Sequence, residues 1–204
     1  MRTVHNEYVP KVESSFPGSV QPDGIALFCA RSVSVAQDTT SPSASDKKIV
    51  QAALQGGTAE VRLGQLAVQK SNTQDVKQFG QKMIDDHTKL GDQMKEVAQK
   101  EGISIPTGAP AKDKQLETTL SSLSGDSFDN AYIKAMIKDH QHDLSEFKRE
   151  ANSGNDTSIE DAASQGRQVI SEHLKLIEQI AKSHNIQMSP VNPEVQPGHR
   201  ESQN

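Results

Sequence analysis

Apolar residues between positions 45 and 187 recur at intervals of three and four, the period of an α-helix. No sustained alternation of apolar and polar residues, the pattern of a half-buried strand, competes with it. The pattern predicts a short helix over 112–123 and four long helices. The long helices run from 45 or 46 to about 70, from 72 or 73 to about 101, from 126 or 127 to about 152, and from 156 or 157 to about 184. The predicted fold class is all-α.

The nine prolines define where the folded part lies, because proline breaks helix interiors. All nine fall outside 46–105 and 111–189, so we expect a helical domain over 45–186. The polar, proline-rich segment 187–204 is expected to be a disordered tail. Residues 1–44 are either a disordered arm or a degenerate export signal, since 24–30 is an apolar run too short to span a bilayer.

Helix length and loop length together favour a four-helix bundle. Helices of about 25 to 29 residues are each about 40 Å long and can lie side by side. Short turns near Ser71 and Gly154 make the helices on either side antiparallel neighbours. The connection that contains Pro106, Pro110 and the short helix could either cross the bundle from end to end or wrap around it.

Composition excludes several classes of function. The net charge is −5, aromatic residues make up 3% of the chain, and there is no Trp, so nucleic acid is not an expected partner. Cys29 is the sole cysteine, which excludes an internal disulfide and a thiolate metal cage. No segment is long and apolar enough to be a transmembrane helix. Partner proteins and oligomeric state are not indicated.

Each long helix carries one metal-ligating residue on its apolar stripe, near the middle of its length. These residues are Glu60, His87, His140 and His173. In an antiparallel bundle they share about one layer. Imidazole nitrogens and a carboxylate are suitable ligands for one divalent transition metal such as zinc, iron or manganese. The alternative is a polar core in which the same residues satisfy one another by hydrogen bonds. The sequence leaves both open.

A short motif is repeated before two of the histidines: MIDDH ends at His87 and MIKDH ends at His140. His173 likewise follows an acid. An acid one position before a histidine lies about 100° around the helix, at the edge of the buried stripe. Asp86, Asp139 and Glu172 could therefore accept hydrogen bonds from histidines on neighbouring helices and orient the rings, or they could face solvent.

Tyr132 is a further candidate for a hydrogen bond to a metal ligand. Its position two turns before His140 favours instead a place at the edge of the bundle, with its hydroxyl group in water.

A carboxylate-bridged di-iron centre is not favoured. Such bundles place a Glu three residues before each liganding histidine, whereas this chain has Ile84, Ile137 and Ile170 at those positions. A second metal ion would require one of the acids that precede the histidines to turn inward.

Several short motifs resemble the bacterial domain-of-unknown-function family 4142. They are Ala59-Glu60, Leu63-Gly64, Leu66-Ala67, Val76 to Phe79, Met83 to His87, Phe128-Asp129 with Tyr132, His140, and His173-Leu174. The resemblance covers about residues 46–184. It implies a ferritin-like bundle and a periplasmic or cell-envelope location, because members are often labelled exported or outer-membrane proteins. It implies no activity, and its shared positions map onto Glu60, Asp86, His87, Tyr132, His140 and His173.

Three functions therefore compete. The first is a periplasmic metal-binding bundle, and the second is a structural or interaction bundle whose polar layer is a hydrogen-bond network. The third, a mononuclear metalloenzyme, ranks last because neither an open coordination position nor a path for a substrate can be identified from the sequence. A role without catalysis is favoured.

Overall fold

The computed structural model describes residues 41–187 of the chain. Within that range it contains five α-helices and no β-strand, which confirms the prediction of an all-α fold. The predicted arm with its apolar run 24–30 and the predicted tail lie outside the described residues, apart from positions 41–44 and 187.

Helix α1 (Ala44–Lys70) begins with a capping box. The Ser43 hydroxyl accepts from the backbone N–H of Asp46 at 3.2 Å, and the Asp46 carboxylate accepts from the backbone N–H of Ser43 at 2.8 Å. The predicted start at 45 or 46 was therefore one or two residues late. Asp46 instead lies in the first turn, because a capping box needs its two side chains three residues apart.

The remaining helices are α2 (Gln74–Lys100), α3 (Ala111–Ser121), α4 (Gly125–Ser153) and α5 (Thr157–Ser183). Helix α5 begins at Thr157, one of the two predicted starts, and Asp156 caps it by accepting from the backbone N–H groups of Ser158 and Ile159. The predicted start of α4 at 126 or 127 was one or two residues late, since the helix begins at Gly125 and its N-cap is Ser124. Gly125 follows it with φ 55°, a conformation that glycine adopts readily, so the helix starts earlier.

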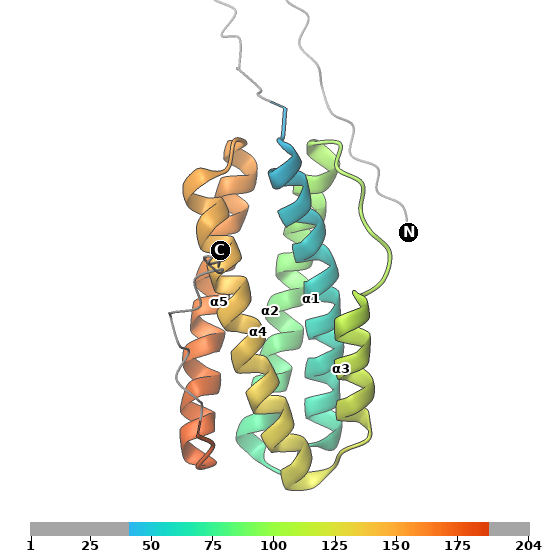
Figure 1. The fold of residues 1–204 in the computed structure, drawn as a ribbon, viewed down its shortest axis with the longest axis vertical. Coiled ribbons are helices and arrows are strands. Elements are labelled where there is room, and N and C mark those ends of the chain that lie inside the picture. Colours follow the sequence, from blue (N-terminus) through green and yellow to red (C-terminus); the bar gives the residue numbers. More distant parts are fainter. Residues whose placement is uncertain (1–40, 188–204) are drawn as a thin grey trace, which may run out of the picture. The chain divides into compact units, whose positions relative to one another are not determined.

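The four long helices pack in two pairs, α1 with α2 and α4 with α5. The pairs meet where α1 contacts α4 and where α2 contacts α5 (Figure 1). Short turns join the members of each pair, which therefore run antiparallel. Between α2 and α4 the chain returns along α1 through the loop 101–110 and α3, which packs on α1 and α4. The connection thus crosses from one end of the helices to the other, one of the two paths that the sequence left open.

The interior consists of two apolar clusters. The smaller one contains residues of α1, α2 and α5 together with the loop residue Ile103: Val50, Leu54, Met94, Ala98, Ile103 and Ile159. The larger one includes residues of all five helices, such as Leu63, Phe79, Leu120, Ile133 and Ile177. On α1 and α2, Glu60 and His87 lie between the positions that contribute to one cluster and those that contribute to the other. The polar residues therefore interrupt an otherwise apolar core.

Two glycines let the backbones of α1 and α2 approach each other closely. A Cβ atom added to Gly64 would lie 2.6 Å from the carbonyl oxygen of Gly80, and one added to Gly80 would lie 2.8 Å from the carbonyl oxygen of Gly64. Gly64 is one turn after Glu60, and Gly80 is two turns before His87. This contact therefore fixes the register that places Glu60 beside His87.

Among residues 41–187, no helix has the length and apolar character needed to cross a bilayer.

Candidate metal centre

The structure brings the four predicted residues together. Glu60, His87, His140 and His173 come from α1, α2, α4 and α5, and none is more than 5% exposed. The three imidazole rings contact one another, with centroids 5.2 to 5.9 Å apart. One nitrogen from each ring lies within 4.8 Å of the other two. Three helices therefore deliver imidazole groups to one buried point, and α1 adds a carboxylate.

His87 is held by Glu60. The distance from Nδ1 of His87 to Oε2 of Glu60 is 3.0 Å, and both side chains are 4% exposed. A carboxylate only accepts, so Nδ1 donates and Nε2 keeps its lone pair in the neutral ring. Nε2 is buried and has no hydrogen-bond partner among the described residues.

His140 is held by its own helix. Its Nδ1 donates to the carbonyl oxygen of Met136, one turn earlier, at 2.9 Å. Nε2 then carries the lone pair, is buried, and has no hydrogen-bond partner in the described part of the chain. It lies 3.8 Å from Oε1 of Glu60, which is too far for a hydrogen bond.

His173 is held by a carboxylate from the neighbouring helix α2. Its Nε2 donates to Oδ2 of Asp86 at 2.7 Å, so Nδ1 carries the lone pair. Within residues 41–187 this Nδ1 also lacks a partner. Each of the three rings thus has one nitrogen fixed as a donor and one buried nitrogen left free, the arrangement found in histidines that bind metals.

The charges suit a cation. Burial alone would raise the pKa of Glu60, but the neighbouring His87, through its charge and its hydrogen bond, outweighs this and lowers the pKa below its usual value. Burial lowers the pKa of His140, and burial lowers that of His173 to about 4 despite the bond to Asp86. At neutral pH the centre therefore holds an ionised carboxylate and at least two neutral imidazoles, which are the protonation states that ligands need.

His87 differs from the other two histidines. Burial lowers its pKa, but the Glu60 carboxylate more than compensates and the pKa is raised above its ordinary value. A metal ion at this site would compete with a proton for His87, so its binding would weaken as the pH falls.

Phe79 forms one wall of the centre. Its ring centroid is 5.9 Å from that of His173 and 6.3 Å from that of His140, and the side chain is fully buried. An apolar wall keeps water away from the free nitrogens on that side and strengthens electrostatic interactions there.

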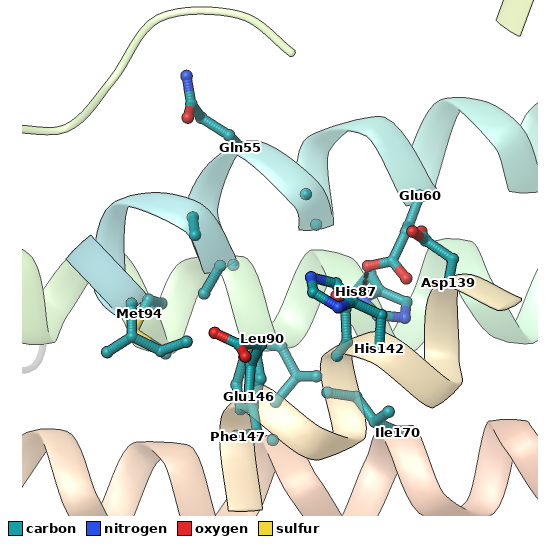
Figure 2. A pocket seen from close by; sticks show the side chains of 18 of the residues that line it. Gln55, Glu60, His87, Leu90, Met94, Asp139, His142, Glu146, Phe147 and Ile170 are labelled. Carbon is teal, nitrogen blue, oxygen red and sulfur yellow. Dashed lines mark ion pairs between the residues drawn. The ribbon is translucent and has the colours of Figure 1, made fainter. Parts of the chain in front are cut away.

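On another side the centre opens into a cavity of about 200 Å³ (Figure 2). Its lining combines apolar and small residues with acids, including Ile49, Gly56, Leu90, Met94, Phe147, Glu60, His87, Asp139, Asp143 and Glu146. Burial raises the pKa of Asp139 to about 6, and burial and the charge of Glu60 also raise that of Asp143. The cavity therefore gives a small ion access to Glu60 and His87 past a group of carboxylates.

The residues predicted to orient the histidines have different environments. Asp86 contacts His173, whereas Asp139 lines the cavity and lies 3.7 Å from Lys112. Glu172 is exposed. Tyr132 is fully buried, stacks on Phe128 and has no hydrogen-bond partner for its hydroxyl among the described residues. The prediction that this hydroxyl faces water was wrong, because Tyr132 lies in the larger apolar cluster with Leu120 of α3.

Sequence reasoning missed Asp143. The available signal was the spacing of Asp139, Asp143 and Glu146 at four and three residues, which places them on one face of α4. That spacing is typical of a solvated helix face, and only the packing shows that all three line a cavity.

The fold and the site together define an all-helical protein with a buried cluster of histidines and carboxylate. Residues 31–180 match the family described as a domain of unknown function, DUF4142, and the chain belongs to that family. This confirms the resemblance identified from the sequence. The comparison with curated proteins found no match.

One solved structure has a similar fold, that of a candidate spore coat protein from Bacillus halodurans C-125. The TM-score is 0.59 at 11% sequence identity, over 73% of this chain and 93% of the other. At this identity the similarity concerns the fold alone.

Proposed function

We propose that the protein binds one divalent transition metal ion through Glu60, His87, His140 and His173, and that it does so without catalysing a reaction. One observation carries the proposal: three buried ring nitrogens from three helices have no hydrogen-bond partner among the described residues, although a nitrogen of each ring lies within 4.8 Å of the others. An unpartnered buried polar group is costly, and three in one place are accounted for by an ion that accepts their lone pairs.

Zinc, iron(II) and manganese(II) are the candidate ions, because imidazole and carboxylate ligands suit all three. A tetrahedral ion with bonds of about 2.0–2.1 Å needs nitrogens about 3.4 Å apart. The three rings would therefore move slightly inward when the ion binds, and Oε1 of Glu60, which is also without a partner, could supply the fourth ligand.

The alternative is a structural bundle in which these residues form a hydrogen-bond network. It is favoured by the fact that each ring already donates one hydrogen bond, to Glu60, Met136 or Asp86. It does not account for the second nitrogen of each ring, which a complete network would pair.

We further propose a ferritin-like topology and a location in the cell envelope. The long connection from α2 through α3 to α4 supports the topology. The labels given to family members and the apolar run 24–30 support the location.

The proposal is tested on protein purified without a histidine tag, stripped with chelator and then mixed with zinc. We expect one equivalent to remain after desalting. At free metal about 100 times Kd, the stabilisation is about 2.7 kcal/mol, which raises Tm by roughly 5–10 °C. His140→Leu should abolish both effects, and His142→Ala, which removes an exposed histidine of the same helix, should retain them. Less than a tenth of an equivalent of zinc, iron or manganese with unchanged Tm would favour the hydrogen-bond network.

A further inference from the structure

A second group of possible ligands adjoins the histidines. Carboxylate oxygens of Glu60, Asp139 and Asp143 lie within 4.8 Å of one another. Asp139 and Asp143 are four residues apart on α4 and so share a face of that helix, while Glu60 comes from α1. Figure 2 shows the Glu60 and Asp139 side chains extending toward each other from the two helices.

Three carboxylates this close repel one another unless one of them binds a proton or a cation lies between them. Lys112 approaches Asp139, but its Nζ is 3.7 Å from the nearest oxygen and its side chain is 65% exposed. This distance exceeds that of a hydrogen bond, and an exposed lysine side chain can turn away into water. Lys112 therefore provides weak compensation that an incoming cation could replace.

The unpartnered oxygen of Glu60 is an independent indication of a ligand. Glu60 is 3% exposed, its Oε2 accepts from His87, and its Oε1 is buried without a hydrogen-bond partner among residues 41–187. A buried carboxylate oxygen in this condition needs a donor or a cation. The cavity of about 200 Å³ is lined by Glu60, Asp139 and Asp143 alike, so there is both room for an ion and a route to it.

We propose that Glu60, Asp139 and Asp143 form a second cation site, which takes a hard divalent ion such as Mn²⁺ or Mg²⁺ beside the histidine site. Oxygen ligands of this kind favour such ions over softer ones. The inference rests on the proposed function in one respect, because Glu60 is shared by the two sites. The centre then holds two ions of different ligand chemistry. The two carboxylates that α4 contributes, Asp139 and Asp143, lie one residue before and three residues after His140, whereas a di-iron bundle has a Glu three residues before each liganding histidine.

The test uses Mn²⁺ as the probe, because free and bound Mn²⁺ differ in their electron paramagnetic resonance signals. Full-length protein is first loaded with one equivalent of zinc, desalted and titrated with Mn²⁺. We expect one bound Mn²⁺ per chain. The double variant Asp139→Asn/Asp143→Asn should retain zinc and lose Mn²⁺ binding at least tenfold. Circular dichroism checks that it folds, which is expected because the substitution removes repulsion.

Glu146→Gln is the matched control, since Glu146 lines the same cavity but is not in the group of three. It should change Mn²⁺ affinity by less than threefold. An equal loss in both variants would show that Mn²⁺ responds only to the overall negative charge, and would overturn the proposed site.

Two further outcomes separate this inference from the proposed function. If zinc binds and Mn²⁺ does not, the second site is refuted and the histidine site stands. If zinc does not bind, zinc is refuted as the ion of the histidine site, and Mn²⁺ is titrated into the metal-free protein. Binding that is lost in the aspartate double variant then supports the carboxylate site, and absence of binding refutes it.

Discussion

The bond between His173 and Asp86 allows a quantitative test of how the histidine site is organised. His173 is fully buried, and its Nε2 donates to Asp86 Oδ2 at 2.7 Å. This bond keeps the proton on Nε2 and leaves the lone pair of Nδ1 for a metal ion. Asp86→Asn preserves the shape of the side chain and removes its charge, so the ring loses its charge-assisted acceptor while the packing is kept.

Loss of such an orienting acceptor lowers metal affinity by about 10–100-fold, which corresponds to about 1.4–2.7 kcal/mol. The Asp86 side chain is 30% exposed and also pairs with Lys82 at 2.8 Å, so solvent and the lysine already weaken its effect on the ring. We therefore expect the lower part of this range, about 10–30-fold.

The assay is a competition titration against a coloured chelator with zinc. Two controls isolate the contact. Asp85→Asn removes the adjacent exposed carboxylate, which contacts Gln81, and should leave affinity unchanged. Lys82→Met removes the surface ion pair and keeps the bond to His173, so zinc affinity should change by less than threefold. If Asp86→Asn binds zinc as tightly as Asp85→Asn, the assigned role of Asp86 is refuted.

Two further predictions concern stability. Gly80→Ala should lower the free energy of unfolding in urea by about 1–3 kcal/mol, because the new Cβ would lie 2.8 Å from the Gly64 carbonyl oxygen. Gly56→Ala, where the new Cβ meets no atom within 4 Å, should instead raise it by up to about 1 kcal/mol. Equal effects of the two substitutions would refute the close contact between α1 and α2. Burial and the hydrogen bond to Asp46 raise the pKa of Glu150 from 4.5 to about 7, so its stabilising contribution is fully present below pH 4.5 and is lost as pH rises through about 7. Glu150→Gln keeps a hydrogen-bond donor and does not ionise. Its free energy of unfolding, relative to that of the native chain, should therefore rise by about 1–3 kcal/mol between pH 5 and 8. If the difference in unfolding free energy between the two proteins stays constant across that range, the raised pKa of Glu150 is contradicted.

The convergence of the four polar residues could be predicted from the sequence for a simple reason. When helices of similar length are joined by short turns, a residue that is on the apolar stripe and near the middle of its helix must lie in the interior at about mid-height. The helical period indicated that Glu60, His87, His140 and His173 face the interior, and the short turns indicated that they lie at a similar height along the helices. The bond partners of the rings were less accessible, and of the three acids that precede the histidines, only Asp86 contacts one of the rings.

The cavity could not be predicted, because it depends on how the helices are spaced. Asp139, Asp143 and Glu146 have the pattern of a solvated face, and their enclosure depends on small residues of α1 such as Gly56 and Gly57 that leave space opposite them. Tyr132 was misplaced for a related reason. The first turns of α4 are buried or exposed according to the path that α3 takes. In the structure Leu120 of α3 lies in the same apolar cluster as Tyr132.

A zinc-soaked crystal with an anomalous difference map recorded at the zinc edge addresses the proposed histidine site directly. We predict one strong peak about 2.0–2.2 Å from Nε2 of His87, Nε2 of His140 and Nδ1 of His173, the nitrogens without hydrogen-bond partners in the described chain. A map with no peak among these rings, or with zinc only at exposed groups such as His142, would contradict the proposal and leave the polar layer as a hydrogen-bond network.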